Sequence, residues 1–171
     1  MGGHGKRTAT VFRHFTHWAA MAALAFLSYY VVSHFLFQSV RVVGRSMTPT
    51  LNDSQQYLLN RWIYYVRAPQ RTDVVVIRDP ADNGFSVKRI IGVSGDSIYL
   101  KGGSVYINGR KLNEPYLPAS TPTYPFGASQ EQFIICGKDQ FFLLGDNRMN
   151  SADSRSYGAV SRNRILGLIV R

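Results

Sequence analysis

A serine and a lysine occupy stretches whose residue types could carry out nucleophilic catalysis. Ser46 lies in the run GRSMTPTL, residues 44–51, after a β-type segment and before a turn that proline restricts. Lys88 lies in the apolar run FSVKRIIG, residues 85–92, where lysine is rarely buried without a reason. A serine hydroxyl attacks once a base takes its proton, and a neutral lysine amine can be that base. Taken singly, each residue has a plainer interpretation: a turn serine, and a lysine that reaches solvent.

The other candidate groups narrow the choice of base. All histidines lie in the first 34 residues, which excludes a histidine-based triad in the body of the chain and disfavours a histidine-ligated metal site; they are His4, His14, His17 and His34. Cys136, the single cysteine, sits in an apolar run and is expected to be a buried strand residue without an intrachain disulfide. A lysine base needs a pKa lowered by about 3 units, worth about 4 kcal/mol, and apolar burial can supply that shift.

A third stretch, GDNRMNSADSR at 145–155, follows the apolar run 141–144. Its short polar side chains and its Asp and Arg residues indicate an ordered hydrogen-bond network rather than a solvated loop. Along 85–91, period-two alternation puts Lys88 and Arg89 on opposite faces of a strand, so one of these cations must share a face with apolar residues.

The N-terminal part of the chain reads as a membrane anchor. Residues 18–37 contain no Asp, Glu, Lys or Arg, and as a helix they would be about 30 Å long. Because the preceding segment is basic, we expect a cytoplasmic N-terminus at 1–17 and a transmembrane helix at 18–37. The expected location is the inner (cytoplasmic) membrane, with a single pass and an extracytoplasmic domain at 38–171. A secretory signal cleaved near Val31 and Ser33, or a buried core helix, is the alternative.

The rest of the chain predicts an all-β fold. Short runs rich in Val, Ile and Tyr are separated by turn signals, and Gly102-Gly103 and Asn108-Gly109 are typical of two-residue hairpins. The β-type runs are 40–43, 73–78, 85–93, 97–101, 105–108, 132–136, 141–144 and 164–170. We expect a compact, mainly antiparallel sheet or barrel-like catalytic domain. Residues 113–130, rich in Pro, Ser and Thr, are expected to be an exposed connecting loop.

The net charge of +10 suggests an anionic partner. The basic residues are scattered between apolar ones, and neither a helix-turn-helix pattern nor a stacked-aromatic module is recognisable. We therefore expect contact with an anionic lipid bilayer and no binding of nucleic acid.

Four motifs, taken in order, resemble the type I signal peptidase family, the bacterial leader peptidases with a serine–lysine dyad. They are SMTPTL at 46–51, VKRIIGVSGD at 87–96, VYING at 105–109, and GDNR with SADSR at 145–148 and 151–155. The resemblance covers residues 18–171. It implies a membrane-bound serine endopeptidase that removes N-terminal signal peptides from exported precursor proteins after small residues, in an Ala-x-Ala pattern, with no cofactor and no metal.

The resemblance also implies roles for individual residues. Ser46 would be the nucleophile, Lys88 the general base and Ser151 the hydroxyl that orients the lysine. The Ser46 backbone N–H would form the oxyanion hole, and Gly44 stands where some members carry a further serine donor. Residues expected to support the site are Gly145, Asp146, Asn147 and Arg148, with an ion pair between Asp153 and Arg155. Shallow substrate pockets are expected from Val42, Met47, Leu51 and Val87.

Two positions depart from the family pattern, and three other functions stay open. Met149 replaces a frequent acidic residue, and Phe85 replaces a residue that is polar in some relatives, which puts local geometry and substrate preference in doubt. The alternatives are a conjugative-transfer relative that processes a pilin precursor, a catalytically silent membrane-anchored β domain that binds a partner, and a soluble serine–lysine self-cleaving repressor. The oligomeric state is not predicted.

Overall fold

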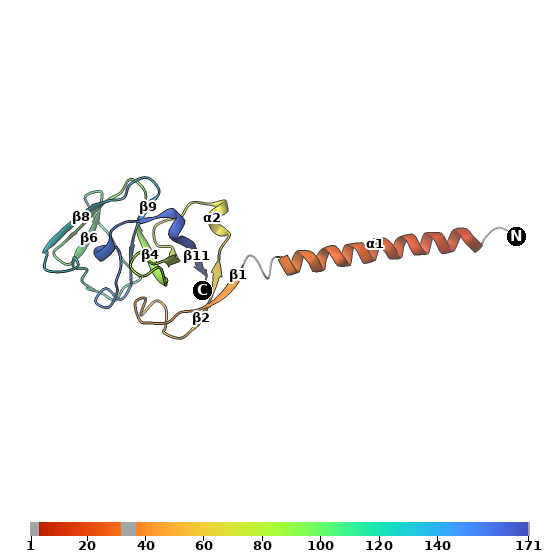
Figure 1. Cartoon of the computed structure of the whole chain (residues 1–171), viewed down its shortest axis with the longest axis horizontal. Coiled ribbons are helices and arrows are strands. Elements are labelled where there is room, and N and C mark those ends of the chain that lie inside the picture. Colours follow the sequence, from red (N-terminus) through yellow and green to blue (C-terminus); the bar gives the residue numbers. More distant parts are fainter. Residues whose placement is uncertain (1–3, 32–36, 171) are drawn as a thin grey trace. The chain divides into compact units, whose positions relative to one another are not determined.

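The computed structural model describes residues 4–31 and 37–170, and the chain divides into two units, Met1–Phe37 and Gln38–Arg171 (Figure 1). The first unit contains helix α1, His4–Val31, whose apolar side chains Trp18, Leu24 and Phe26 are exposed. Among the described residues, no helix combines the length and the apolar character needed to cross a membrane.

The expected helix at 18–37 had incorrect bounds. Helix α1 begins at His4, within the segment predicted as a basic tail, and Phe37 begins strand β1, Phe37–Arg41. Residues 32–36 of the expected helix lie outside the described residues. Aromatic and β-branched residues suit a helix and a strand alike, so the apolar run could not mark where one element ends.

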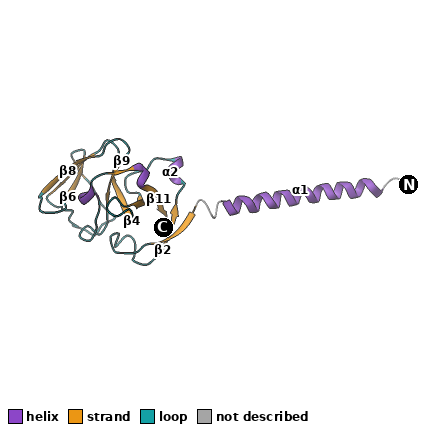
Figure 2. Cartoon of the chain, in the orientation of Figure 1, coloured by secondary structure: helices purple, strands orange, loops and turns teal. Residues whose placement is uncertain are grey.

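The second unit is a mainly antiparallel β domain, as predicted, and contains two sheets (Figure 2). The larger sheet has the order β1-β2-β11-β3-β4-β9-β10, and its pairings from β2 to β10 are antiparallel. Its strands after β1 are β2 (Gln56–Asn60), β11 (Ile165–Val170), β3 (Val74–Arg78), β4 (Phe85–Gly92), β9 (Gln140–Leu144) and β10 (Val160–Ser161).

The smaller sheet is a four-stranded antiparallel sheet with the order β7-β6-β5-β8. Its strands are β5 (Ser97–Lys101), β6 (Ser104–Ile107), β7 (Arg110–Lys111) and β8 (Glu131–Ile135). The two predicted hairpins are confirmed here, because Gly102-Gly103 joins β5 to β6 and Asn108-Gly109 joins β6 to β7. All four turn residues have positive φ, as a type I′ turn requires. The short helices are α2 (Ile63–Val66), α3 (Ser154–Tyr157) and the 3₁₀ turn η2 (Arg162–Arg164).

Strand β4 lies between β3 and β9 and contributes to the cores on both of its faces. Ile90 packs in one cluster with Val75 and Leu143, and Ile91 packs in another with Phe142. Cys136, one residue past β8, is buried in the second cluster as expected, and burial raises the pKa of its thiol to about 11. A central strand buried on both faces gives its polar residues a fixed, dry environment.

The segment 113–130 is a loop, as expected, but it is not simply an exposed connector. Thr123 is 1% exposed, Pro125 is buried, and Glu114 and Tyr116 are half-buried. The prediction of exposure was wrong for these residues; Glu114 and Thr123 bond Arg148 in the run that follows β9, and the Tyr116 ring lies against Arg89 of β4. A Pro- and Ser-rich composition predicts the lack of regular structure, but it does not predict contacts with distant residues.

Candidate active site

Ser46 is presented by a tight turn whose neighbouring residues are anchored in the core. The amide and hydroxyl of Thr48 both donate to the Arg45 carbonyl, at 3.2 and 2.8 Å, and the Thr48–Pro49 peptide is cis. Met47 and Leu51 are 1% exposed. Ser46 itself is half-buried, so the turn holds it at the surface of a rigid support.

This turn is fixed to the loop that follows β9. The Asn147 amide donates to the Ser46 carbonyl at 2.9 Å, and the Asn147 side chain donates to the Arg45 carbonyl and the Thr48 hydroxyl, each at 3.1 Å. Two segments of the predicted site, separated by about one hundred residues, therefore lie side by side.

Gly145 lies between Ser46 and Ser151. A Cβ atom at this position would be 2.6 Å from the Ser46 carbonyl oxygen, and it would also overlap the Ser151 side chain. The position therefore has no room for any side chain. The Ser151 hydroxyl oxygen is buried and has no hydrogen-bond partner among the described residues. A hydroxyl of this kind is available to a nearby amine.

The substitution Gly145→Ala is expected to lower kcat/KM at least about 10-fold and to destabilise the domain by about 1–3 kcal/mol, because the methyl group forces the turn and Ser151 apart. Peptide hydrolysis and denaturant unfolding measure the two effects. Gly84→Ala is the matched control, since the three atoms nearest to its Cβ would all belong to the carboxylate of Asp82, an exposed side chain. Equal behaviour of the two variants would contradict the packing argument.

Lys88 lies in the middle of β4, opposite Val75 on β3, and is 3% exposed. Its ammonium group donates to the Val87 carbonyl at 3.2 Å. Burial lowers the pKa of the Lys88 amine, and the carboxylates of Asp153 and Asp79 oppose this shift. Burial therefore shifts the protonation equilibrium of Lys88 toward the neutral amine, the form that can act as a base.

The strand pairing places the backbone of Lys88 close to the start of the loop after β9, which contains Ser151 and is bonded to the Ser46 turn. Arg89, the next residue, pairs with Leu144 at the end of β9, and Gly145 follows directly. Arg89 forms a buried bidentate ion pair with Asp146, with Nε–Oδ1 and Nη2–Oδ2 distances of 2.9 and 2.6 Å. Its Nη2 also donates to the Thr50 hydroxyl at 3.3 Å. One guanidinium group thus joins the lysine strand, the loop after β9 and the serine turn.

Asp153 and Arg155 form a second buried ion pair, in which Nε and Nη2 of the arginine each lie 2.8 Å from a carboxylate oxygen. Asp153 also accepts from the Gly145 amide at 3.0 Å and caps helix α3 through the Arg155 amide at 3.2 Å. Its carboxylate therefore fixes the backbone position of Gly145, against which Ser46 and Ser151 pack.

A cavity of about 620 Å³ opens at Ser46. Val42 and Val87, both expected to contact substrate, line it together with Phe85 and Ser86. The other two expected pocket residues, Met47 and Leu51, lie instead in the hydrophobic core with Val42. The reason is the tight turn, which directs these two apolar side chains inward while Ser46 stays at the surface.

Gly44 has φ of +101°, in the region that favours glycine, and its amide donates to the Asp53 carboxylate at 2.8 Å. A serine at this position would be strained on the order of 1–3 kcal/mol. The Gly44 amide is already engaged with Asp53. This amide is therefore not free to act as a second donor to the oxyanion.

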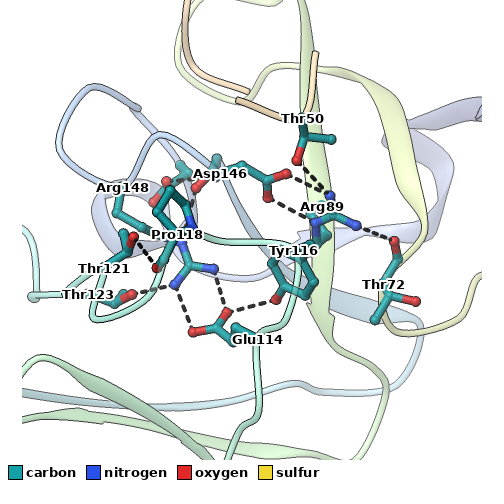
Figure 3. A network of polar contacts seen from close by, with 12 residues as sticks. Thr50, Thr72, Arg89, Glu114, Tyr116, Pro118, Thr121, Thr123, Asp146 and Arg148 are labelled. Carbon is teal, nitrogen blue, oxygen red and sulfur yellow. Dashed lines mark hydrogen bonds and ion pairs between the residues drawn. The ribbon is translucent and has the colours of Figure 1, made fainter. Parts of the chain in front are cut away.

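Sequence reasoning missed several polar residues around the site. Arg148 does not pair within its own run but with Glu114, at 3.0 Å between Nη1 and Oε2, and it also bonds the Thr123 hydroxyl (Figure 3). Arg89 and Thr50 were not singled out as site residues. Because 10 acidic residues stand against 20 basic ones, a carboxylate such as Glu114 in the Pro-rich loop is expected to pair with an arginine. The sequence does not show which arginine that is.

Comparison with known proteins defines the class. Residues 15–171 match the family model described as signal peptidase, peptidase S26. The chain is 34% identical over 160 residues to a signal peptidase I of Bacillus amyloliquefaciens, covering 88% of this chain and 80% of that protein. It is 34% identical over 163 residues to signal peptidase I T of Bacillus subtilis strain 168 (90% and 82%), and 31% identical over 164 residues to signal peptidase IB of Staphylococcus aureus (89% and 85%).

A crystal structure of a signal peptidase I from Enterococcus faecalis is similar, with a TM-score of 0.52 and 28% sequence identity, over 61% of this chain and 98% of that one. The fold and the matched sequences together define a serine peptidase. The chain belongs to the S26 family of signal peptidases, and its activity is that of a signal peptidase I, the removal of signal peptides. This assignment excludes the catalytically silent domain and the self-cleaving repressor.

Proposed function

We propose that Ser46 is the nucleophile and Lys88 the general base, and that the enzyme cleaves exported precursors after small residues. The observation that carries the proposal is the buried Lys88 amine, whose pKa burial lowers, on the strand beside the loop that fixes Ser46. The unpartnered Ser151 hydroxyl within the described structure supports its role in orienting the amine.

The reaction follows from these groups. The neutral Lys88 amine takes the Ser46 proton as Oγ attacks the scissile carbonyl carbon. The Ser46 backbone N–H stabilises the resulting oxyanion by donating a hydrogen bond to it. The Lys88 ammonium then gives its proton to the leaving amine, which departs and leaves an acyl-enzyme. A water molecule attacks the ester carbonyl while Lys88 takes its proton. The intermediate then collapses: the C–Oγ bond breaks, the Lys88 ammonium returns the proton to Ser46 Oγ, and the new carboxyl terminus is released.

The substrate is proposed to bind as an added strand. Residues 85–88 of β4 pair with β3 on one side, whereas the described pairing with β9 begins only at Arg89. The opposite edge of 85–88 can therefore offer backbone groups to an extended peptide beside the cavity. Val42 and Val87 restrict the space for substrate side chains there, which favours small residues such as Ala in an Ala-x-Ala sequence.

We further propose that residues 18–37 hold the chain at the cytoplasmic membrane, with 1–17 on the cytoplasmic side and 38–171 outside. The support is the uncharged sequence of 18–37 and the basic residues before it. In the second unit, exposed Tyr65 and Val66 stand close in sequence to Arg61 and Arg67, a combination suited to a lipid–water interface. Recovery of the full chain in the soluble fraction of lysed cells would contradict this placement.

A fluorogenic peptide with an Ala-x-Ala site tests the dyad. Ser46→Ala and Lys88→Ala are each expected to abolish turnover, while Lys101→Ala, at an exposed lysine on β5, is expected to retain it. The kcat/KM of the wild type is expected to rise with pH through a pKa below the ~10.4 of a free lysine. Turnover by Lys88→Ala, or a controlling pKa near ~10.4, would overturn the assignment of the base.

The same variants separate the general enzyme from the conjugative-transfer alternative. Growth of a signal peptidase-deficient strain should be restored by the wild type and not by Ser46→Ala. Failure of the wild type to restore growth, combined with full peptide hydrolysis, would favour a narrow, dedicated precursor.

A further inference from the structure

Glu114, Tyr116 and Thr123 of loop 113–130 take part in a polar network with Arg89, Asp146 and Arg148 (Figure 3). Glu114 accepts from Arg148 at 3.0 Å and from the Tyr116 hydroxyl at 2.7 Å. Burial raises the pKa of Tyr116, so its hydroxyl stays protonated and donates. The side chain of Arg148 is 0% exposed and that of Glu114 is 13% exposed. The pair is therefore shielded from water.

The first arm of this network leads to Gly145. Within residues 4–31 and 37–170, Glu114 is the carboxylate in ion-pair contact with Arg148. The Arg148 Nε donates to the Gly145 carbonyl at 3.1 Å. Gly145 in turn packs against the Ser46 carbonyl and the Ser151 side chain. The Glu114 carboxylate and the Thr123 hydroxyl thus both hold Arg148, and Arg148 holds the peptide against which both serines pack.

The second arm leads to the strand of the lysine. The Tyr116 ring, whose hydroxyl is bonded to Glu114, lies against the Arg89 guanidinium with 3.9 Å between its centroid and Cζ. Arg89 is the residue after Lys88. Its guanidinium also bonds Asp146, in the loop after β9, and Thr50, in the serine turn. An aromatic face restricts such a guanidinium to one plane and stabilises its charge.

We propose that Glu114 is a positioning residue for the reaction. It acts through Arg148 on the loop after β9, against which Ser46 and Ser151 pack, and through Tyr116 on strand β4, which carries Lys88. The proposal rests on the Ser46–Lys88 assignment. Glu114 itself does not contact the reacting atoms, and its carboxylate sets the spacing between the nucleophile and the base. Because misplacement of reacting groups by about 1 Å can cost about 100-fold in rate, a small shift of either arm lowers kcat.

The test compares Glu114→Gln with Glu131→Gln, which changes an exposed glutamate on β8 paired to Lys101. Glu114→Gln keeps the size of the side chain but removes the charge opposite Arg148. We expect kcat per folded enzyme to fall about 10–100-fold with KM within about 3-fold, whereas Glu131→Gln behaves as wild type. Partial recovery of kcat in Glu114→Asp is expected. An unchanged kcat, or a loss that only tracks the folded fraction, would overturn the proposal.

A second pair of variants keeps the proposal testable if Glu114→Gln does not fold. Tyr116→Phe keeps the ring against Arg89 but removes the hydroxyl that bonds to Glu114, so its kcat is expected to fall about 3–10-fold, and that of Tyr116→Leu, which also removes the ring, at least about 10-fold. A wild-type kcat in Tyr116→Phe would overturn the second arm. Retained turnover in Ser46→Ala or Lys88→Ala would overturn the dyad and with it the role of Glu114. If the dyad variants are inactive and Glu114→Gln has the kcat of the wild type, only the role of Glu114 is overturned.

Discussion

Lys88→Met is expected to abolish hydrolysis and at the same time to raise the stability of the protein at pH 7. Activity should fall at least about 10⁴-fold because the base is lost. Stability should rise because burial lowers the pKa of the native amine, so the folded protein pays for a buried charge that methionine does not carry. The gain is about 1.4 kcal/mol for each unit by which the native pKa is lowered.

The pH dependence of this gain has a definite sign. Below the native pKa, Lys88 is protonated in both states and the wild type is destabilised to the full extent. Between the native pKa and the unfolded value of ~10.4, the unfolded chain binds more protons, so wild-type stability rises with pH. The advantage of Lys88→Met should therefore narrow as pH approaches 10. Denaturant unfolding at pH 7 and 10 measures it, with Lys101→Met as the exposed control. A variant less stable than wild type at pH 7 would contradict the buried-charge argument.

Asp146→Ala is expected to cost about 3–5 kcal/mol of unfolding free energy, because it leaves the buried Arg89 guanidinium without its carboxylate. Arg89 is 5% exposed and Asp146 is 1% exposed, so water cannot replace the lost partner. Equilibrium unfolding in urea by the full chain gives the value, and peptide hydrolysis should fall with it because Arg89 joins the serine turn to the lysine strand.

The control for this prediction is Glu131→Ala, which breaks the exposed Lys101–Glu131 pair and should cost less than about 1 kcal/mol. If Asp146→Ala and Glu131→Ala lost similar amounts, the Arg89–Asp146 pair would not be the stabilising link between the two segments.

The sequence predicted those features that depend on local pattern. Gly102-Gly103 and Asn108-Gly109 identified two hairpins because few residues adopt positive φ at low cost. Period-two alternation predicted that one of the cations Lys88 and Arg89 shares a face with apolar residues, and both are in fact buried, at 3% and 5% exposed. The roles of Ser46, Lys88 and Ser151 came from motif resemblance and stay predictions.

What the sequence could not predict depends on contacts between distant segments. Glu114 and Arg148 are 34 residues apart, and no local pattern relates them. Asp146 pairs across the sheet with Arg89 rather than with the neighbouring Arg148. Met47 and Leu51 have the composition of pocket residues, and only the geometry of the turn directs them into the core. The strand that begins at Phe37 was also missed, because the apolar residues of this run suit a helix and a strand alike.

The position of β11 has a consequence for how the enzyme is made. This strand, Ile165–Val170, lies between β2 and β3, although it is the last strand of the chain. The segment with the serine turn and the strand with Lys88 stand on opposite sides of it in the sheet order. The two parts of the sheet are therefore joined only when β11 pairs with both β2 and β3, and such long-range pairing forms late in folding. The serine turn and the Lys88 strand thus reach their final register in one of the last steps of folding.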